Sequence, residues 1–179
     1  MEPPAPAAVP IFETDRPWNP GRPETLVVAC SDGRLQMEID EFLAARLGIS
    51  HYDRLYLPGG AGALASSGSD FLRAYDLSAQ CRGMIAAHAT RHVVLLFHGP
   101  APGGPDEAVC LDYRRKLPGG SAEAIRAEQE RDAHELLESG MGPGVALSAY
   151  RCEVRPDGRM RVVPLGGSED GSTRAPRRP

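Results

Sequence analysis

The sequence predicts a single α/β domain, in which a mainly parallel sheet is flanked by helices and carries an antiparallel hairpin at its edge. Two short apolar runs, at residues 25–30 and 92–98, are typical of strands buried on both faces. Segments with apolar residues at helical spacing separate the strands, and this strand–helix–strand order implies crossover connections between parallel strands. The length of 179 residues suits one domain.

The predicted elements alternate along the chain. In order they are a strand at 25–30, a helix at 36–47, a strand at 52–57, a helix at 70–89, a strand at 92–98, a helix at 121–138, and two strands at 145–154 and 160–165. Residues that favour helix ends stand at the helix boundaries: Ser69 or Asp70 before the second helix, Ser121 before the third, Gly48 after the first and Gly140 after the third. The Pro-Asp-Gly run at 156–158 predicts the hairpin turn between the last two strands.

The two ends of the chain differ in composition from the segment between them. Residues 1–23 contain seven prolines, which prevent a regular helix, so we expect an extended arm. Its apolar residues Ile11, Phe12 and Trp18 would need a surface to cover them, such as that of a second subunit. The tail at 166–179 is rich in Gly, Ser, Arg and Pro and is expected to be disordered, which leaves 24–165 as the folded domain.

Composition and charge exclude several classes of protein. The net charge of −4 argues against a nucleic-acid-binding protein, which usually carries a basic stripe. No segment approaches the roughly 18 apolar residues that a membrane span requires. The first ten residues lack the basic start and apolar run of a signal peptide, so we expect a cytoplasmic protein. In that reducing compartment the four cysteines are expected to be thiols or metal ligands rather than disulfides.

Two of the predicted strands end in residues that can bind a metal. The first strand ends at Cys30 and the third at His98. Because open α/β sheets bind their ligands at the carboxyl ends of the strands, we expect the thiol and the imidazole to lie at the same edge. Cys sulfur and His nitrogen are ligands that zinc takes in tetrahedral geometry, so the pattern predicts a zinc site.

The run Cys-Ser-Asp-Gly-Arg at 30–34, which follows a Val-rich strand, resembles the Cys-x-Asp-x-Arg motif of the β-class carbonic anhydrases. The resemblance extends over most of the chain, from 25 to 165. Residues 55–62 are similar to the second strand and glycine-containing loop of that family, and the hairpin at 150–165 is similar to its C-terminal strands. The resemblance implies a zinc enzyme that reversibly hydrates CO2 to bicarbonate through a zinc-bound hydroxide. It also implies a homodimer or a higher homo-oligomer.

The sequence departs from this family at the third metal ligand. In the family a Cys follows the His by three residues, whereas this chain has Ala101 at that position. The next cysteine is Cys110, beyond a loop that can span about 30 Å when extended and can therefore fold back beside His98. Some carbonic-anhydrase-like proteins show a similar pattern, with a Pro-containing loop and a more distant Cys. We predict Cys30, His98 and Cys110 as the protein ligands of Zn2+.

The resemblance also implies that Asp32 and Arg34 form an ion pair beside the metal and take part in catalysis. In an extended turn their side chains point to the same side as that of Cys30. Asp32 would orient the hydroxide or accept its hydrogen bond, whereas a site with Asp32 bound to the zinc would be closed and inactive. Three functions stay open: hydration of CO2, hydrolysis of another small linear substrate such as COS or CS2, and a structural or regulatory subunit without catalysis, which Ala101 motivates.

The remaining candidate residues have simpler interpretations. Cys81 and Cys152 fall within apolar patterns and are predicted to be core or half-exposed thiols. The Gly-Gly-Ala-Gly run at 59–62 lacks the Lys and Ser/Thr of a phosphate-binding loop and is interpreted as a tight turn near the site. The charge-rich run at 123–138 is interpreted as a solvated helix face. Four histidines are predicted to be surface or boundary residues: His51, His88, His92 and His134.

Overall fold

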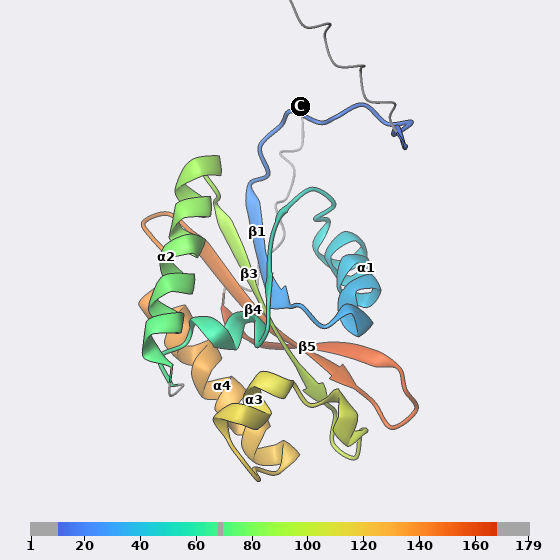
Figure 1. The fold of residues 1–179 in the computed structure, drawn as a ribbon, viewed down its shortest axis with the longest axis vertical. Coiled ribbons are helices and arrows are strands. Elements are labelled where there is room, and N and C mark those ends of the chain that lie inside the picture. Colours follow the sequence, from blue (N-terminus) through green and yellow to red (C-terminus); the bar gives the residue numbers. More distant parts are fainter. Residues whose placement is uncertain (1–10, 68–69, 168–179) are drawn as a thin grey trace, which may run out of the picture.

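The structure is a computed structural model that describes residues 11–67 and 70–167 (Figure 1). Within these residues one sheet has the strand order β2-β1-β3-β4-β5. The strands are β1 (Thr25–Cys30), β2 (Asp53–Leu57), β3 (His92–Pro100), β4 (Ala146–Val154) and β5 (Met160–Gly167). The first four pair in parallel, and β5 pairs antiparallel with β4 at the edge. The predicted α/β class and the edge hairpin are confirmed.

Three of the helices in the described residues lie where the apolar spacing predicts them, and the short helix at 111–116 is additional. The helices are α1 (Gln36–Leu47), α2 (Phe71–His88), α3 (Leu111–Lys116) and α4 (Ala122–Ser139). The side chain of Asp70 accepts a hydrogen bond from the backbone of Arg73, and that of Ser121 accepts one from the backbone of Ala124, so both act as N-caps. The alternative N-cap Ser69 lies outside the described residues. Gly48 ends α1 in the left-handed conformation, with φ of 68°.

Two strands run further than the sequence pattern predicted. β3 continues through Gly99 and Pro100, because these residues pair with Glu153 and Val154 of β4. β5 continues through Gly166 and Gly167, which pair with the amino-terminal part of β4. The prediction that a disordered tail begins at residue 166 is therefore wrong for these two residues. The rest of that tail, 168–179, lies outside the described part of the chain.

Helices cover both faces of the sheet (Figure 1). Because successive strand residues point to opposite faces, Leu26 and Val28 pack towards α2 and α4, whereas Val27 and Ala29 pack towards α1. Along β1 all four of these side chains are fully buried, as expected for a central strand of a parallel sheet.

The order of the strands reverses next to β1. The chain moves from β1 to β2 on one side and then crosses to β3 on the other side of β1. In open α/β sheets this reversal leaves a crevice at the carboxyl ends of the two strands, where ligands bind. Cys30 ends β1 and His98 lies near the end of β3, so both stand at this crevice.

The N-terminal arm is described from residue 11. Residues 11–23 form neither helix nor strand, in agreement with their prolines, and run away from the domain at the amino end of β1 (Figure 1). The side chains of Ile11, Phe12 and Trp18 are exposed. None of the helices in the described residues is both long enough and apolar enough to cross a membrane.

Candidate metal site

Cys30 is the last residue of β1, and the chain turns two residues later. The backbone N–H of Ser31 donates to the carbonyl of Leu57 at 3.1 Å, which keeps the chain beside β2 for one more residue. Asp32 then caps the short 3-10 turn Gly33–Leu35, accepting a hydrogen bond from the backbone of Arg34. This turn leads directly into α1, so the Cys30 sulfur and the Asp32 carboxylate are held on one rigid segment.

His98 is held in a single orientation by its neighbours. Its ring is buried, and Nδ1 lies 3.2 Å from the carbonyl oxygen of Ala108. A carbonyl only accepts hydrogen bonds, so Nδ1 is the donor, and in the neutral imidazole this leaves Nε2 as the acceptor. Nε2 is buried and has no hydrogen-bond partner among the described residues. The backbone oxygen of His98 also accepts a hydrogen bond from Gln129 of α4, at 2.8 Å.

Cys110 comes to the same place through the loop that follows β3. The loop turns back because Ala101 donates to the carbonyl of Val154 and Gly104 donates to the carbonyl of Ala101, each at 2.8 Å. A 3-10 turn at Asp106–Ala108 follows, and Cys110 is the residue directly before α3. Its side chain is buried. The loop thus folds back towards His98, as its length allows.

The three donor atoms form one cluster. The sulfurs of Cys30 and Cys110 and a ring nitrogen of His98 all lie within 4.8 Å of one another. The hydrogen bond from the Cys110 thiol, helped by His98, lowers the pKa of Cys30 to about 4, against the effect of burial. The neighbouring Cys30 thiolate and burial raise the pKa of Cys110. A bound cation would favour ionisation of both sulfurs.

Asp32 and Arg34 form the expected ion pair beside this cluster. Arg34 Nη2 lies 2.6 Å from Asp32 Oδ2, and Arg34 Nε lies 3.0 Å from Asp32 Oδ1, so the guanidinium holds both carboxylate oxygens. These hydrogen bonds lower the pKa of Asp32 to about 2. Asp32 is therefore a carboxylate at every physiological pH. Arg34 Nη2 also donates to the carbonyl of Glu107, which connects the pair to the loop of Cys110.

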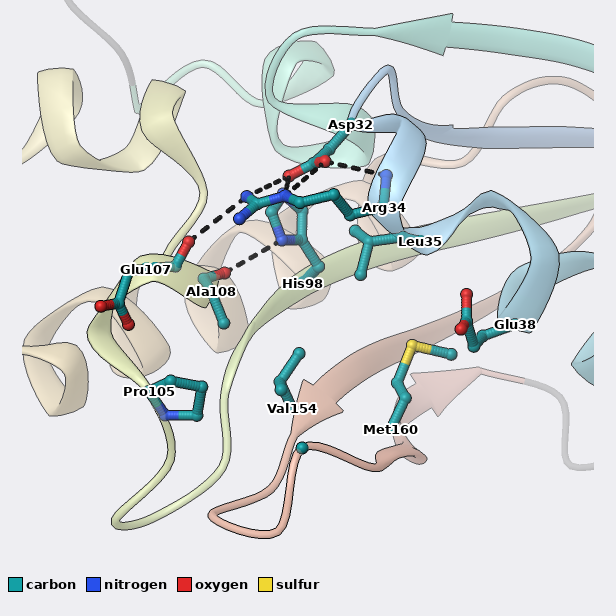
Figure 2. A pocket seen from close by; sticks show the side chains of 11 residues that line it. Asp32, Arg34, Leu35, Glu38, His98, Pro105, Glu107, Ala108, Val154 and Met160 are labelled. Atoms are coloured by element: carbon teal, nitrogen blue, oxygen red, sulfur yellow. Dashed lines mark hydrogen bonds and ion pairs between the residues drawn. The ribbon is translucent and has the colours of Figure 1, made fainter.

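A pocket of about 220 Å³ opens beside His98, Asp32 and Arg34 (Figure 2). Three segments build it: the turn after β1, the loop after β3, and the β4–β5 hairpin. Its wall includes the apolar side chains of Leu35, Ala108, Val154 and Met160, and its polar lining includes Glu38 and Glu107. Pockets for drug-sized ligands measure roughly 300–1,000 Å³, so this pocket suits a smaller molecule.

The donor set fits zinc. Two sulfurs and one imidazole nitrogen are a known ligand combination of catalytic zinc, and they leave the fourth tetrahedral position for water or substrate. The unpartnered and buried Nε2 of His98 would be satisfied by a metal ion. The Nδ1 hydrogen bond to Ala108 is the outer-shell contact that zinc-binding histidines usually make. The carboxylate of Asp32 pairs with Arg34 and is therefore not counted among the metal ligands.

The interpretation of 123–138 as a solvated face is wrong for part of α4. Glu128, Gln129 and Asp132 are buried. Two of them bond to residues at or near the donor cluster. Gln129 holds the backbone of His98, and Asp132 accepts from Tyr113 of α3. The sequence carried a signal for this: these residues interrupt the stripe of buried apolar residues at 125, 133 and 136, where a solvated residue would not stand. The rest of the run includes exposed residues, among them His134 and Glu138.

The other predicted positions contribute no atom to the donor cluster. Cys81 is buried against the α2 side of the sheet and Cys152 against the α1 side, as predicted for core thiols. The glycine run at 59–62 forms a tight turn beside Cys30. His51 and His134 are exposed, and His88 and His92 are partly buried.

Comparison with known proteins gives likenesses of fold. No protein-family model matches the chain, and no curated protein matches it. Among solved structures, a β-carbonic anhydrase isoform I from Trichomonas vaginalis is 12% identical with a TM-score of 0.46, covering 87% of this chain and 88% of that one. A carbonic anhydrase from Glaciozyma antarctica is 18% identical with a TM-score of 0.42, covering 82% and 84%. The apo form of a carbon disulfide hydrolase is 14% identical with a TM-score of 0.40, covering 79% of each chain. All three likenesses are at identities below 20% and TM-scores below 0.5.

Proposed function

We propose that this chain binds one Zn2+ through Cys30, His98 and Cys110 and catalyses the reversible hydration of CO2 to bicarbonate. The observation that carries the proposal is the cluster of two sulfurs and a ring nitrogen of His98 within 4.8 Å of one another. In the same ring, the buried Nε2 has no hydrogen-bond partner among the described residues. This cluster adjoins a small pocket lined by an ionised carboxylate. A metal site with a free position, a pocket and a fixed carboxylate are the parts that a hydration reaction needs.

The chain's own residues divide the work at this site. Zinc, when bound, supplies a Lewis acid that lowers the pKa of water to about 7, so that hydroxide is available near neutral pH. Asp32 cannot serve as a strong base, because its pKa is lowered to about 2, and it acts as a fixed hydrogen-bond acceptor. In that role it would accept a hydrogen bond from a hydroxyl group bound beside it and so orient that group towards CO2. Arg34 keeps the carboxylate in this position and prevents its protonation.

The pocket suits the substrate. CO2 is small, linear and uncharged, and the apolar side chains of Leu35, Val154 and Met160 provide a wall that such a molecule can contact. The exposed guanidinium of Arg34 stands at the same pocket, where bicarbonate forms as an anion. A pocket of this kind admits COS and CS2 as well, so these molecules belong in the test.

Purified protein should contain about one zinc per chain and should accelerate CO2 hydration in a stopped-flow assay with a pH indicator. The Cys30→Ser variant should lose both zinc and activity. COS and CS2 are assayed with the same protein, and turnover of one of them without CO2 hydration would reassign the substrate. Zinc-loaded protein that turns over none of the three molecules between neutral and alkaline pH would support the non-catalytic alternative.

We also propose that the chain forms a homodimer or a higher homo-oligomer, with residues 24–167 as the metal-binding domain. Exposed apolar side chains in the N-terminal arm support this proposal: Ile11, Phe12 and Trp18. Burial of these side chains against a second subunit would stabilise the assembly. Light scattering of the full chain and of the triple variant Ile11→Ser/Phe12→Ser/Trp18→Ser tests it. A cytoplasmic location accords with four free thiols, two of which the site requires.

A further inference from the structure

We propose that Tyr113 and Asp132 position Cys110 for metal binding, so that the chain's affinity for zinc depends on a hydrogen bond made outside the coordination sphere. The inference rests on the zinc site of the proposed function and assigns a role to residues that do not touch the metal. It also explains the glycine run at 59–62 and the buried acidic residues of α4, neither of which the donor cluster itself requires.

The need for positioning follows from the loop between His98 and Cys110. A long loop does not by itself hold its two ends together, because closing it costs conformational entropy. Cys110 stands directly before α3, a helix of only 6 residues with no side-chain cap at its start. A helix this short is not stable by itself. The place of the Cys110 sulfur is therefore set by whatever holds α3.

Two side chains on one face of α3 attach it to α4. Tyr113 and Lys116 are three residues apart and both reach the same carboxylate. The Tyr113 hydroxyl donates to Asp132 Oδ2 at 2.5 Å, and Lys116 Nζ lies 2.5 Å from the same oxygen. Asp132 is completely buried and Tyr113 is 2% exposed, so water competes little for these bonds. Lys116 also pairs with Glu128 at 3.4 Å.

The glycine turn, residues 59–62, packs closely against α3. A Cβ at Gly62 would overlap the Tyr113 hydroxyl, and a Cβ at Gly59 would overlap the carboxylate of Asp112. Between them, a Cβ at Gly60 would lie 2.8 Å from the backbone nitrogen of Cys30. The turn therefore contacts the backbone of one proposed ligand and the helix that carries another. Its glycines let α3 approach Cys30 closely, and the bond from Tyr113 to Asp132 fixes that approach.

The test is the Tyr113→Phe variant, which removes one hydroxyl and keeps the ring. Asp132 retains Lys116 and Ser67 as partners, so the fold is expected to persist. Zinc affinity, measured by competition with a chelator, should fall about 10–100-fold, the usual effect of losing an outer-shell contact. In the Co2+-substituted protein, the thiolate-to-cobalt charge-transfer absorption should fall towards that of Cys110→Ala, which retains a single thiolate ligand.

The matched control is Tyr52→Phe, which removes a tyrosine hydroxyl from a hydrogen bond to Asp40 on the α1 side of the sheet. It should leave both the zinc affinity and the cobalt spectrum unchanged. Lys116→Gln removes the other bond between α3 and Asp132 and should also lower zinc affinity. This second variant tests the inference if Tyr113→Phe does not fold.

The outcomes separate this inference from the site on which it rests. If Cys110→Ala weakens zinc binding while Tyr113→Phe and Lys116→Gln bind zinc like the unchanged chain, the positioning role is overturned and the ligand set stands. If Cys110→Ala itself binds zinc normally, the ligand set is wrong and the inference fails with it.

Discussion

The Nδ1 atom of His98 lies 3.2 Å from the carbonyl oxygen of Ala108, two residues before Cys110. The loop that supplies one sulfur of the donor cluster therefore also sets the orientation of the imidazole. Arg34 donates to the carbonyl of Glu107 in the same loop, so the pair with Asp32 is connected to it as well. Metal binding and the position of the carboxylate should consequently respond together to changes in residues 101–110.

Removal of Cys110 should abolish tight zinc binding. The Cys110→Ala variant loses one of three donor atoms, so its zinc affinity should fall by more than about 100-fold, beyond the effect of an outer-shell change. The matched control is Cys81→Ala, which removes a thiol that is equally buried but lies in α2. Metal analysis after dialysis measures both. Equal zinc contents in the two variants would remove Cys110 from the site.

Removal of zinc should lower thermal stability. A ligand that binds only the folded state at 100 times its dissociation constant contributes about 2.7 kcal/mol to the free energy of unfolding. For a domain of this size each kcal/mol shifts Tm by about 2–4 °C, so we expect a fall of about 5–11 °C on chelation. Calorimetry with and without a chelator measures it. The Cys30→Ser variant should show almost no difference between the two conditions.

Replacement of Arg34 by Lys should lower activity without releasing the metal. A lysine keeps the charge but cannot hold both oxygens of Asp32, so the carboxylate loses its fixed position. We expect kcat/KM for CO2 hydration to fall about 100-fold, the loss that a misplaced positioning group causes. Arg54→Lys is the control, since Arg54 pairs with Asp40 at the surface of β2. Lost zinc in Arg34→Lys would show that the ion pair serves the metal site instead.

Glu153 should make the fold sensitive to acid. The residue is 1% exposed, and burial alone would raise its pKa, but hydrogen bonds from Arg161 and Arg151 outweigh burial and lower it. A lowered pKa in the folded state means that the pairing stabilises the protein above the unfolded value of about 4.3 and is lost as pH falls through the folded value. Glu153→Gln should cost about 3 kcal/mol at neutral pH, and the difference should shrink below about pH 4.

Denaturant titrations at several pH values measure this effect. The control is Glu130→Gln, which removes an exposed partner of the same Arg151 and should cost less than about 1 kcal/mol. A cost for Glu153→Gln that stayed constant down to pH 3 would contradict the assignment.

The sheet and two members of the donor cluster could be predicted because local patterns determine them. The apolar runs at 25–30 and 92–98 are typical of buried strands, and the crossover connections make them parallel. Cys30 and His98 then follow, since each stands at the carboxyl end of its strand. The adjacency of Asp32 and Arg34 likewise depends on one tight turn.

The support of Cys110 could not be predicted in the same way. Its position depends on contacts between α3, α4 and the glycine turn, which are distant from one another in sequence. Asp132 and Glu128 looked solvated because charged residues usually are, yet Tyr113 and Lys116 provide the partners that make their burial stable. Spacing indicates that these residues face the core, but it does not identify the partners that stabilise them there.

Two glycine-to-alanine substitutions should change stability in opposite directions. Gly60 has φ of +57°, and a Cβ there would lie 2.8 Å from both the nitrogen of Cys30 and the oxygen of Leu96. Neither backbone atom can move without disturbing the sheet, so Gly60→Ala should cost at least about 2 kcal/mol and weaken zinc binding. Gly83 lies within α2 with no atom near its added Cβ, so Gly83→Ala should stabilise the protein by about 0.5–1 kcal/mol. Denaturant unfolding of the metal-free proteins, followed by zinc titration, measures both effects. A Gly60→Ala protein with normal stability and zinc affinity would show that close packing of the glycine turn against Cys30 is not needed.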